Sequence, residues 1–175
     1  MEKRWVLKKK GDAEVIKRLQ EELKISFPLA NLLAQRNINN FKEAQDFFRP
    51  KLTHLHDPFL MNDMDKAVER IKKAVLGKEK ILIYGDYDVD GTSAVALVYS
   101  FFREFYENID FYIPDRYNEG YGISFKSIDF AKENNFKLVI ALDCGIKATE
   151  QIKYANSKGI DFIIGDHHRP GNEMP

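Results

Sequence analysis

The segment Ile81-Leu82-Ile83-Tyr84-Gly85-Asp86-Tyr87-Asp88-Val89-Asp90-Gly91 decides the fold of this chain. Its first four residues are all apolar or aromatic, which is typical of a strand covered by helices on both faces of a parallel sheet. The seven residues that follow contain three aspartates and two glycines. Because open parallel sheets bind their ligands beyond the carboxyl ends of the strands, these seven residues are expected to form part of a functional site.

The chain after Lys80 repeats this alternation between short apolar runs and longer amphipathic segments, a pattern typical of βαβ units. We expect strands at 81–84, 109–113, 138–142 and 160–164, and helices at about 92–106, 125–133 and 147–157. Ser124 is a candidate N-cap for the second of these helices, and Gly159 is a candidate stop after the third. The pattern predicts an α/β fold with an open, mainly parallel sheet and helices on both faces.

The residues before Gly77 follow a helical pattern instead. Apolar side chains recur at helical spacing in 12–23, 29–35, 41–48 and 64–75. Asn40 is a plausible N-cap for the third of these helices, and Gly77 is well placed to end the fourth. We therefore expect a small helical N-terminal segment at 1–77 and the α/β domain at 78–175.

The composition of the 175 residues is that of a globular protein, with 44% hydrophobic and 31% charged residues. No apolar run approaches the roughly 20 residues that span a bilayer, and no apolar signal region follows the charged start. A soluble protein without an export signal is therefore expected. Cys144 is the only cysteine. A single cysteine excludes an internal disulfide and a multi-cysteine zinc site, and it fits a reducing cytoplasm.

The charge of the chain is balanced, with 27 Lys plus Arg and 27 Asp plus Glu. No basic field extends over the whole protein, so any binding of nucleic acid must be local. Residues 1–24 are the one uneven stretch, with eight basic and five acidic side chains. We interpret this stretch as the solvated surface of a helix.

Acidic and imidazole side chains follow the expected strands. The first strand leads into the three aspartates of 86–90, and the later strands lead into Asp115-Arg116, Asp143-Cys144-Gly145 and Asp166-His167-His168. Two carboxylates about 4 Å apart repel each other by about 4 kcal/mol at an effective dielectric near 20, so a divalent cation is expected to compensate. Carboxylates mixed with imidazole suit Mn²⁺ or Mg²⁺. Ligands from several loops favour two ions, which together can hold a phosphate.

A calcium-binding or nucleotide-binding loop at residues 86–91 fits the sequence less well. The three aspartates and the final glycine match the start of an EF-hand loop, but Leu97 stands where that loop needs its last Glu, and a strand precedes it rather than a helix. The glycine patterns of a dinucleotide-binding turn and of a Walker A loop are absent. A solvated acidic turn would explain one acidic loop but not four in succession.

Four elements resemble the DHH phosphoesterase family in order and spacing. The segments 86–91 (Asp-Tyr-Asp-Val-Asp-Gly), 143–145 (Asp-Cys-Gly) and 166–168 (Asp-His-His) are similar to the first three motifs of that family. The segment 116–124 (Arg-Tyr-Asn-Glu-Gly-Tyr-Gly-Ile-Ser) and the helical stretch before the first motif resemble its RecJ branch. The resemblance runs from about Leu29 to Pro175 and implies a metal-dependent phosphodiesterase.

The resemblance implies that four side chains are metal ligands and take part in catalysis: Asp88, Asp90, Asp143 and His167. Asp143 would be in a position to bridge two ions, and Asp86 is either a further ligand or an acceptor behind the ligands. Some relatives carry a metal-binding His four residues before Asp88, where this chain has Tyr84. That departure argues against the pyrophosphatase branch and shifts the ligand burden towards carboxylates.

Further side chains are expected around these ligands. Asp166 is expected to orient a histidine, because a ligating imidazole usually donates its other N–H to a carboxylate. His168 is expected to face the substrate phosphate as a catalytic donor or proton carrier, the alternative being a ring packed under the turn that follows it. Arg116 is a candidate phosphate clamp or the partner of a neighbouring carboxylate. Tyr121 is a candidate for base stacking or loop packing, and Lys147 is a weaker phosphate candidate.

The RecJ resemblance implies a 5′-to-3′ exonuclease that releases 5′-mononucleotides from single-stranded DNA in DNA repair and recombination. Two alternatives stay open: a DHH phosphodiesterase that cleaves short oligonucleotides or cyclic dinucleotides, and a non-catalytic DNA-binding scaffold of the same fold. Relatives in the family carry a fourth motif and a second domain, which would lie after Pro175. We therefore expect an incomplete chain that binds metal weakly and has little or no nuclease activity alone.

Overall fold

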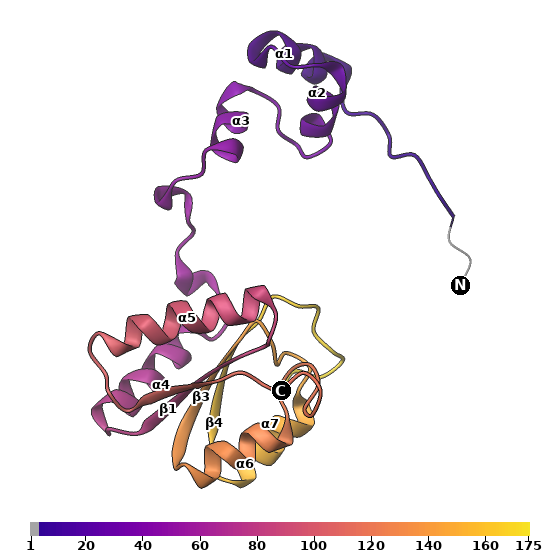
Figure 1. Ribbon diagram of the computed structural model, residues 1–175. Helices are drawn as coiled ribbons and strands as arrows, with labels where there is room; N and C mark the ends of the chain where they lie inside the picture. Colours follow the sequence, from indigo (N-terminus) through magenta and orange to yellow (C-terminus); the bar gives the residue numbers. More distant parts are fainter. Residues whose placement is uncertain (1–3) are drawn as a thin grey trace. The chain divides into compact units, whose positions relative to one another are not determined.

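The computed structural model describes residues 4–175. The chain divides into two compact units, Met1–Leu60 and Met61–Pro175 (Figure 1). The first unit is built from helices, and the second contains a sheet. No helix among the described residues is long and apolar enough to cross a membrane.

The N-terminal unit is a small cluster of helices. Its elements are α1 (Ala13–Leu23), α2 (Phe27–Ala34), α3 (Phe41–Phe48) and two short 3-10 helices, η1 (Leu52–His54) and η2 (Pro58–Leu60). The carboxylate of Asp12 caps α1 by accepting hydrogen bonds from two backbone N–H groups. The side chain of Asn40 caps α3 in the same way, which confirms the expected cap. Six buried side chains form the core of this unit: Ile16, Leu19, Ala30, Leu33, Ile38 and Ala44.

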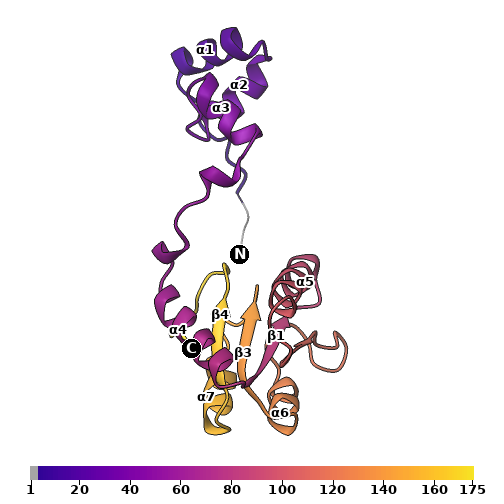
Figure 2. The same ribbon diagram turned by 90° about the vertical axis from the view of Figure 1, so that its left-hand side faces the viewer.

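The second unit is an α/β domain. Its elements are α4 (Met64–Leu76), β1 (Lys80–Gly85), α5 (Val89–Arg103), β2 (Ile109–Tyr112), α6 (Phe125–Glu133), β3 (Phe136–Leu142), α7 (Thr149–Ser157) and β4 (Asp161–Gly165). The four strands are all parallel and lie in the order β2-β1-β3-β4, and Figure 2 shows β1, β3 and β4 with their shared direction. The side chain of Ser124 caps α6, as expected. The expected open parallel sheet is confirmed.

Alternate side chains of the central strand β1 face two different layers of helices. Leu82 and Tyr84 pack in one buried cluster with residues of α6 and α7, whereas Ile81 and Ile83 pack in another with residues of α4 and α5. All four side chains are at most 1% exposed. Full burial of an apolar side chain of this size contributes about 1.5–3 kcal/mol. The unbroken apolar run therefore ties the sheet to both layers.

The helix α4 belongs to the sheet and not to the helical segment before it. Ala74 is fully buried in the cluster that also contains Ile81 and Ile83, and Ile71 and Val75 pack against that cluster. The division of the chain therefore falls at residue 60, whereas the sequence pattern predicted it at residue 77. The pattern identified the helix correctly but could not show which core its apolar face would join.

Only part of the basic stretch 1–24 is helical, whereas the sequence pattern predicted a helix surface for all of it. The helix α1 begins at Ala13, and residues 4–11 have no regular secondary structure. The solvated helix surface expected for 1–24 therefore describes only its second half. Residues 1–3 of that stretch lie outside the described residues.

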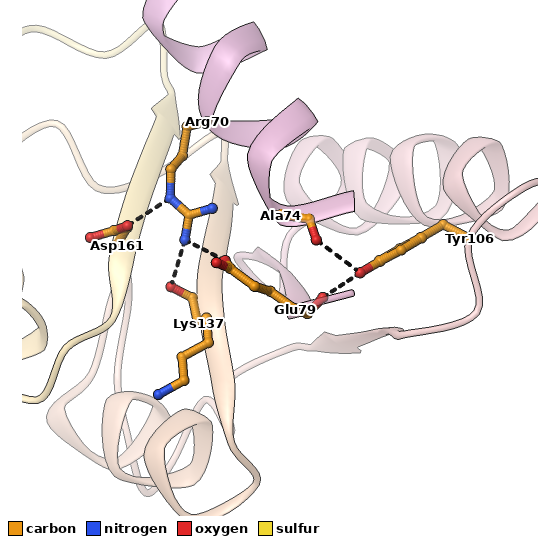
Figure 3. Close-up of polar contacts among 6 residues, drawn as sticks. All are labelled: Arg70, Ala74, Glu79, Tyr106, Lys137 and Asp161. Carbon is orange, nitrogen blue, oxygen red and sulfur yellow. Dashed lines mark hydrogen bonds and ion pairs between the residues drawn. The ribbon is translucent and has the colours of Figure 1, made fainter. Parts of the chain in front are cut away.

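One arginine joins α4 to the amino-terminal edge of the sheet (Figure 3). The Nε of Arg70 donates a hydrogen bond of 2.6 Å to Asp161, at the start of β4. Its Nη2 donates to Glu79 at 2.7 Å and to the carbonyl of Lys137 at 3.3 Å. The arginine side chain is only 18% exposed. These contacts fix α4 across β1, β3 and β4 at the edge opposite the acidic loops.

We expect Arg70→Ala to lower the free energy of unfolding by about 2 kcal/mol, because it removes charge-assisted hydrogen bonds from a largely buried group. The measurement is urea unfolding followed by circular dichroism. The matched control is Lys72→Ala, whose exposed pair with Glu69 is expected to contribute less than about 1 kcal/mol. Equal effects of the two substitutions would contradict this role of Arg70.

Candidate metal centre

The parallel register lines up the carboxyl ends of three strands. Gly85 of β1 pairs with Leu142 of β3, and Leu142 in turn pairs with Gly165 of β4. The residue that follows each paired position is an aspartate: Asp86, Asp143 and Asp166. Neighbouring strands lie about 4.8 Å apart. Backbone pairing therefore gathers three carboxylates at one edge of the sheet.

The segment after β1 enters a helix earlier than expected. The helix α5 starts at Val89 rather than near residue 92, because the carboxylate of Asp88 caps it by accepting a hydrogen bond of 2.9 Å from the N–H of Gly91. Asp90 lies exposed in the first helical turn. A Cβ on Gly91 would lie 2.6 Å from the backbone N and O of Asp86. Glycine at this position therefore allows the helix to start directly against the end of the strand.

Asp86 is fully buried and anchors a neighbouring loop. One of its carboxylate oxygens accepts a hydrogen bond of 2.7 Å from the N–H of Tyr87, and the other accepts one of 2.9 Å from the N–H of Gly122. The hydroxyl of Tyr84 donates to the carbonyl of the same glycine at 2.7 Å. Tyr84 therefore serves with Asp86 to hold Gly122 against β1.

Asp143 has an unusual backbone conformation at the end of β3. Its φ is 59°, in the left-handed region that residues other than glycine rarely adopt. Its N–H donates to the carbonyl of Gly165 at 2.8 Å. The side chain is 10% exposed, and Oδ1 lies 3.0 Å from Nε2 of the much more exposed His167. A left-handed non-glycine residue costs about 1–3 kcal/mol, and such residues cluster at functional sites.

Asp166 connects the loops that follow β3 and β4. Its side chain is only 2% exposed. Oδ1 accepts hydrogen bonds from the backbone N–H of His168 at 3.0 Å and from Nδ1 of the same residue at 2.7 Å. Oδ2 accepts one of 2.9 Å from the N–H of Ile146. Burial raises the pKa of Asp166, but these hydrogen bonds outweigh it and bring the pKa below its ordinary value. The hydrogen bond to Asp166 in turn raises the pKa of His168.

Three of these side chains form the group best suited to a cation within the described part of the chain. Asp143, His167 and His168 each offer one ligand atom, and these atoms all lie within 4.8 Å of one another. We call these three residues the metal group. One carboxylate with two imidazoles is a donor set that suits Mn²⁺ and other divalent cations. The residues present therefore fit the metal that the family resemblance implies.

The composition of this group differs in part from the expected set of ligands. His168 was expected to face substrate, yet its Nδ1 bond to Asp166 is the arrangement usual for a metal-ligating histidine. The signal in the sequence was the aspartate two residues before it. Asp88 and Asp90, which were expected as ligands, are not part of the group.

The carboxylates at this edge of the sheet together raise the pKa values of Cys144 and Tyr121. Burial and the charge of four carboxylates raise the pKa of Cys144 to about 12. These carboxylates are Asp86, Asp166, Asp143 and Asp88. Burial, followed by three of the same charges, also raises the pKa of Tyr121. Asp88 therefore shares the electrostatic environment of Asp143 and Asp166.

The loop 115–124 is organised by Glu119. Its carboxylate accepts hydrogen bonds from the hydroxyls of Tyr112 at 3.0 Å and Ser124 at 2.6 Å. It also accepts one of 3.0 Å from the N–H of Asp115. Burial raises the pKa of Glu119, but these hydrogen bonds outweigh it and lower the pKa below its ordinary value. One carboxylate therefore closes the two ends of the loop on each other.

Arg116 in this loop is linked to His168 through a row of rings. Among the described residues Arg116 forms no ion pair, so the expected alternative of a bond to a neighbouring carboxylate is not what the structure has. Its guanidinium lies over the ring of Tyr87 at 5.3 Å. Tyr87 packs edge-on against Tyr121, and Tyr121 packs edge-on against His168, with ring centres 6.0 and 6.4 Å apart.

A cavity of about 310 Å³ lies beside the metal group. Tyr121, Lys147 and His168, which the sequence singled out for contacts with substrate, all line it. Gln151 of α7 lines it too, and no motif in the sequence marks this residue. Arg116 is not part of the lining. The candidate substrate contacts therefore divide between the cavity and the row of rings beside it.

Comparisons with known proteins show what this chain is similar to. Residues 80–175 match the model of the DHH family, N-terminal domain. The chain is 40% identical over 172 residues to the single-stranded-DNA-specific exonuclease RecJ of Bacillus subtilis (strain 168), covering 98% of this chain and 22% of that protein. It is 31% identical over 148 residues to RecJ of Escherichia coli (strain K12), covering 84% and 25% respectively. The chain thus spans about a fifth to a quarter of the length of these relatives.

Two solved structures have a similar fold. The crystal structure of exonuclease RecJ bound to manganese is 27% identical, with a TM-score of 0.61 over 66% of this chain and 30% of that one. RecJ of Thermus thermophilus in complex with Mn²⁺ is 20% identical, with a TM-score of 0.68 over 94% of this chain and 22% of that one. The second likeness shows the shared fold.

We expect Gly91→Ala to destabilise the α/β domain by about 2 kcal/mol or to prevent its folding, because the new methyl group would collide with the backbone of Asp86. Urea unfolding measures the effect. Gly165→Ala is the matched control, since a Cβ at that strand end would meet its neighbours at 3.6 Å or more. The close approach of α5 to β1 would be refuted if both variants were equally stable.

The lowered pKa of Glu119 predicts a pH-dependent contribution to stability. A carboxyl group with a lowered pKa stabilises the fold above its unfolded-state pKa of about 4.3, and this stabilisation is lost as the pH falls through the folded-state value. The stability advantage of the native chain over Glu119→Gln should therefore be full near neutral pH and shrink in acid. Urea unfolding of both proteins across this range tests it, and an advantage that grows in acid would contradict it.

Proposed function

The chain belongs to the DHH family, and on that premise we propose that it forms the metal-binding part of an exonuclease that degrades single-stranded DNA. The observation that carries this proposal is the convergence of Asp143, His167 and His168 within 4.8 Å at the carboxyl edge of the sheet. The similarity of nearly the whole chain to the Bacillus subtilis RecJ exonuclease supports the choice of substrate. The α/β domain that carries this role corresponds to Met61–Pro175.

We infer that the site takes two divalent cations, Mn²⁺ or Mg²⁺. Asp143, His167 and His168 would hold one of them, and Asp88 and Asp90 would contribute carboxylates to the other. Asp88 uses Oδ1 to cap α5, which leaves Oδ2 for an ion. The manganese in the two related RecJ structures supports this type of cation. Bound divalent cations polarise phosphoryl oxygens and make water a nucleophile near neutral pH.

The protein's own groups would orient the reaction. Asp166 holds the ring of His168 through Nδ1, which directs its Nε2 away from that carboxylate and towards an ion or a phosphate oxygen. Asp86 is already satisfied by two backbone N–H groups, so its role would be to position the loop that carries Tyr121. Both aspartates thus support the site without having to contact substrate.

Contacts with the DNA strand would come from three residues. Arg116 lacks a carboxylate partner among the described residues and lies over a tyrosine ring, which suits a guanidinium that clamps a phosphate. Tyr121 is 56% exposed beside His168 and could stack on a base. Lys147 lines the cavity next to the metal group and would attract a backbone phosphate.

The direction of cleavage follows from the family resemblance. We propose digestion from the 5′ end with release of 5′-mononucleotides, in DNA repair and recombination. The similarity to proteins named for their specificity for single-stranded DNA favours long strands over dinucleotides as substrates. Cleavage of a dinucleotide in preference to a long strand would instead favour the sibling phosphodiesterase.

We expect Asp143→Ala and His167→Ala each to weaken Mn²⁺ binding by about 10-fold or more, because each removes a donor from the group. Isothermal titration calorimetry of the full-length protein with MnCl₂ measures the Mn²⁺ affinity. The control is Asp110→Ala, which removes an exposed carboxylate on β2 outside the group. Unchanged Mn²⁺ affinity in both ligand variants would refute the assignment.

The activity is tested on the same proteins with single-stranded DNA labelled at its 5′ end. We expect Mn²⁺-dependent release of mononucleotides that EDTA and Asp143→Ala abolish and Asp110→Ala retains. Residues 1–175 alone, assayed in parallel, are expected to release little. Release that continues in EDTA, or in the Asp143→Ala variant, would contradict a metal-dependent nuclease.

A further inference from the structure

A basic segment with an exposed tryptophan precedes the first helix of the N-terminal unit. Residues 4–10 read Arg-Trp-Val-Leu-Lys-Lys-Lys, with four positive charges and no acidic residue. All seven residues are exposed, and Trp5 is 98% exposed. A ring so open to water contributes nothing to the core of this unit. We call residues 4–10 the basic segment.

Hydrogen bonds hold the end of the basic segment against α2. The side-chain Nε2 of Gln35 donates to the carbonyl of Lys9 at 2.7 Å, and the Nζ of Lys8 donates to the carbonyl of Gln35 at 3.2 Å. The N–H of Gly11 donates to Oδ1 of Asn31 at 2.9 Å. The lysines therefore have a defined place on the unit, although the segment has no regular secondary structure.

The positive charges of the basic segment lack acidic partners within residues 4–175. None of its four cationic side chains takes part in an ion pair there. The nearest acidic residue that follows in sequence, Asp12, already accepts two hydrogen bonds from the start of α1. Lys10 lies over the ring of Phe27 at 5.5 Å, and that residue is itself 44% exposed. Cations and exposed rings thus lie together on this unit.

The N-terminal unit as a whole is also positively charged. Residues 1–60 carry twelve Lys and Arg against eight Asp and Glu, whereas residues 61–175 carry fifteen against nineteen. The balanced charge of the full chain therefore conceals a basic unit and an acidic one. A polyanion would be attracted to the first and, without cations in the metal group, repelled by the second.

We propose that the basic segment, with Phe27, is a separate binding surface for single-stranded nucleic acid, in which Lys8, Lys9 and Lys10 contact phosphates and Trp5 stacks on an unpaired base. The inference rests on the proposed function for the identity of the polymer. Basic grooves with exposed aromatic rings are the usual way to bind single strands without reading their sequence. An anionic membrane is a poorer partner, because surface binding to lipid generally uses an amphipathic helix and this segment is not helical.

The only tryptophan of the chain lies in the proposed surface and reports on it directly. Residues 1–175 are titrated with a short oligothymidine in EDTA, which removes any contribution of bound metal. Stacking on Trp5 should give saturable quenching of its fluorescence. Trp5→Ala, followed by the anisotropy of labelled DNA, should weaken binding by about 5-fold or more. This residue is fully exposed, so its replacement should leave the fold intact.

The triple variant Lys8→Gln, Lys9→Gln, Lys10→Gln should weaken DNA binding at low salt by about 10-fold or more. The slope of log affinity against log salt concentration should become shallower by about 2. The charge-matched control replaces Lys66, Lys72 and Lys153 by Gln. Each of these lysines is already paired with a neighbouring carboxylate. The control should bind within about 2-fold of the native chain.

Three results would overturn the proposal: DNA binding without quenching of Trp5, equal weakening in the two triple variants, or quenching by phosphatidylserine vesicles but not by oligothymidine. The experiment is independent of the nuclease assay. Binding is measured in EDTA and therefore does not depend on a bound cation. Failure of metal-dependent cleavage would therefore refute the proposed function. The quenching of Trp5 and the effect of the lysine substitutions would still test whether the basic segment binds single strands.

Discussion

The register in which β1, β3 and β4 pair is the constraint on which the rest of the α/β domain depends. Side chains alternate between the two faces of a strand, so a shift of one residue would turn every core side chain of β1 towards the wrong layer of helices. The apolar run Ile81–Tyr84 has buried partners on both faces and so resists such a shift energetically. The same register places Asp86, Asp143 and Asp166 at one edge, so the packing of the core determines where the acids meet.

Gathering carboxylates at one edge costs electrostatic free energy, and the structure offsets it in two different ways. The side chains of Asp86 and Asp166 are buried and accept hydrogen bonds from backbone N–H groups at both oxygens. Asp143 instead faces two imidazoles from a left-handed backbone position. The satisfied carboxylates hold the loops in place, and the remaining one, with its histidines, supplies the donors that we propose for a cation. This division of roles links the stability of the fold to the chemistry of the site.

Local sequence signals were enough to predict the alternation of strands and helices, the caps at Asn40 and Ser124, and the edge at which the polar residues collect. Contacts between distant residues could not be predicted. The role of Asp86 depends on Gly122, 36 residues later, and the place of α4 depends on the bond from Arg70 to Asp161, 91 residues later. The early start of α5 was missed because Asp88 was interpreted only as a ligand, although aspartate is also a strong N-cap.

The central claim is that Asp143, His167 and His168 form a cation site at the carboxyl edge of the sheet. Anomalous X-ray diffraction from crystals soaked in MnCl₂ tests it most directly, because manganese gives a signal that locates the ion without reference to activity. Our account predicts a peak in direct contact with the carboxylate of Asp143 and with at least one of the two imidazoles. A manganese peak bound elsewhere, with none at these three side chains, would contradict it.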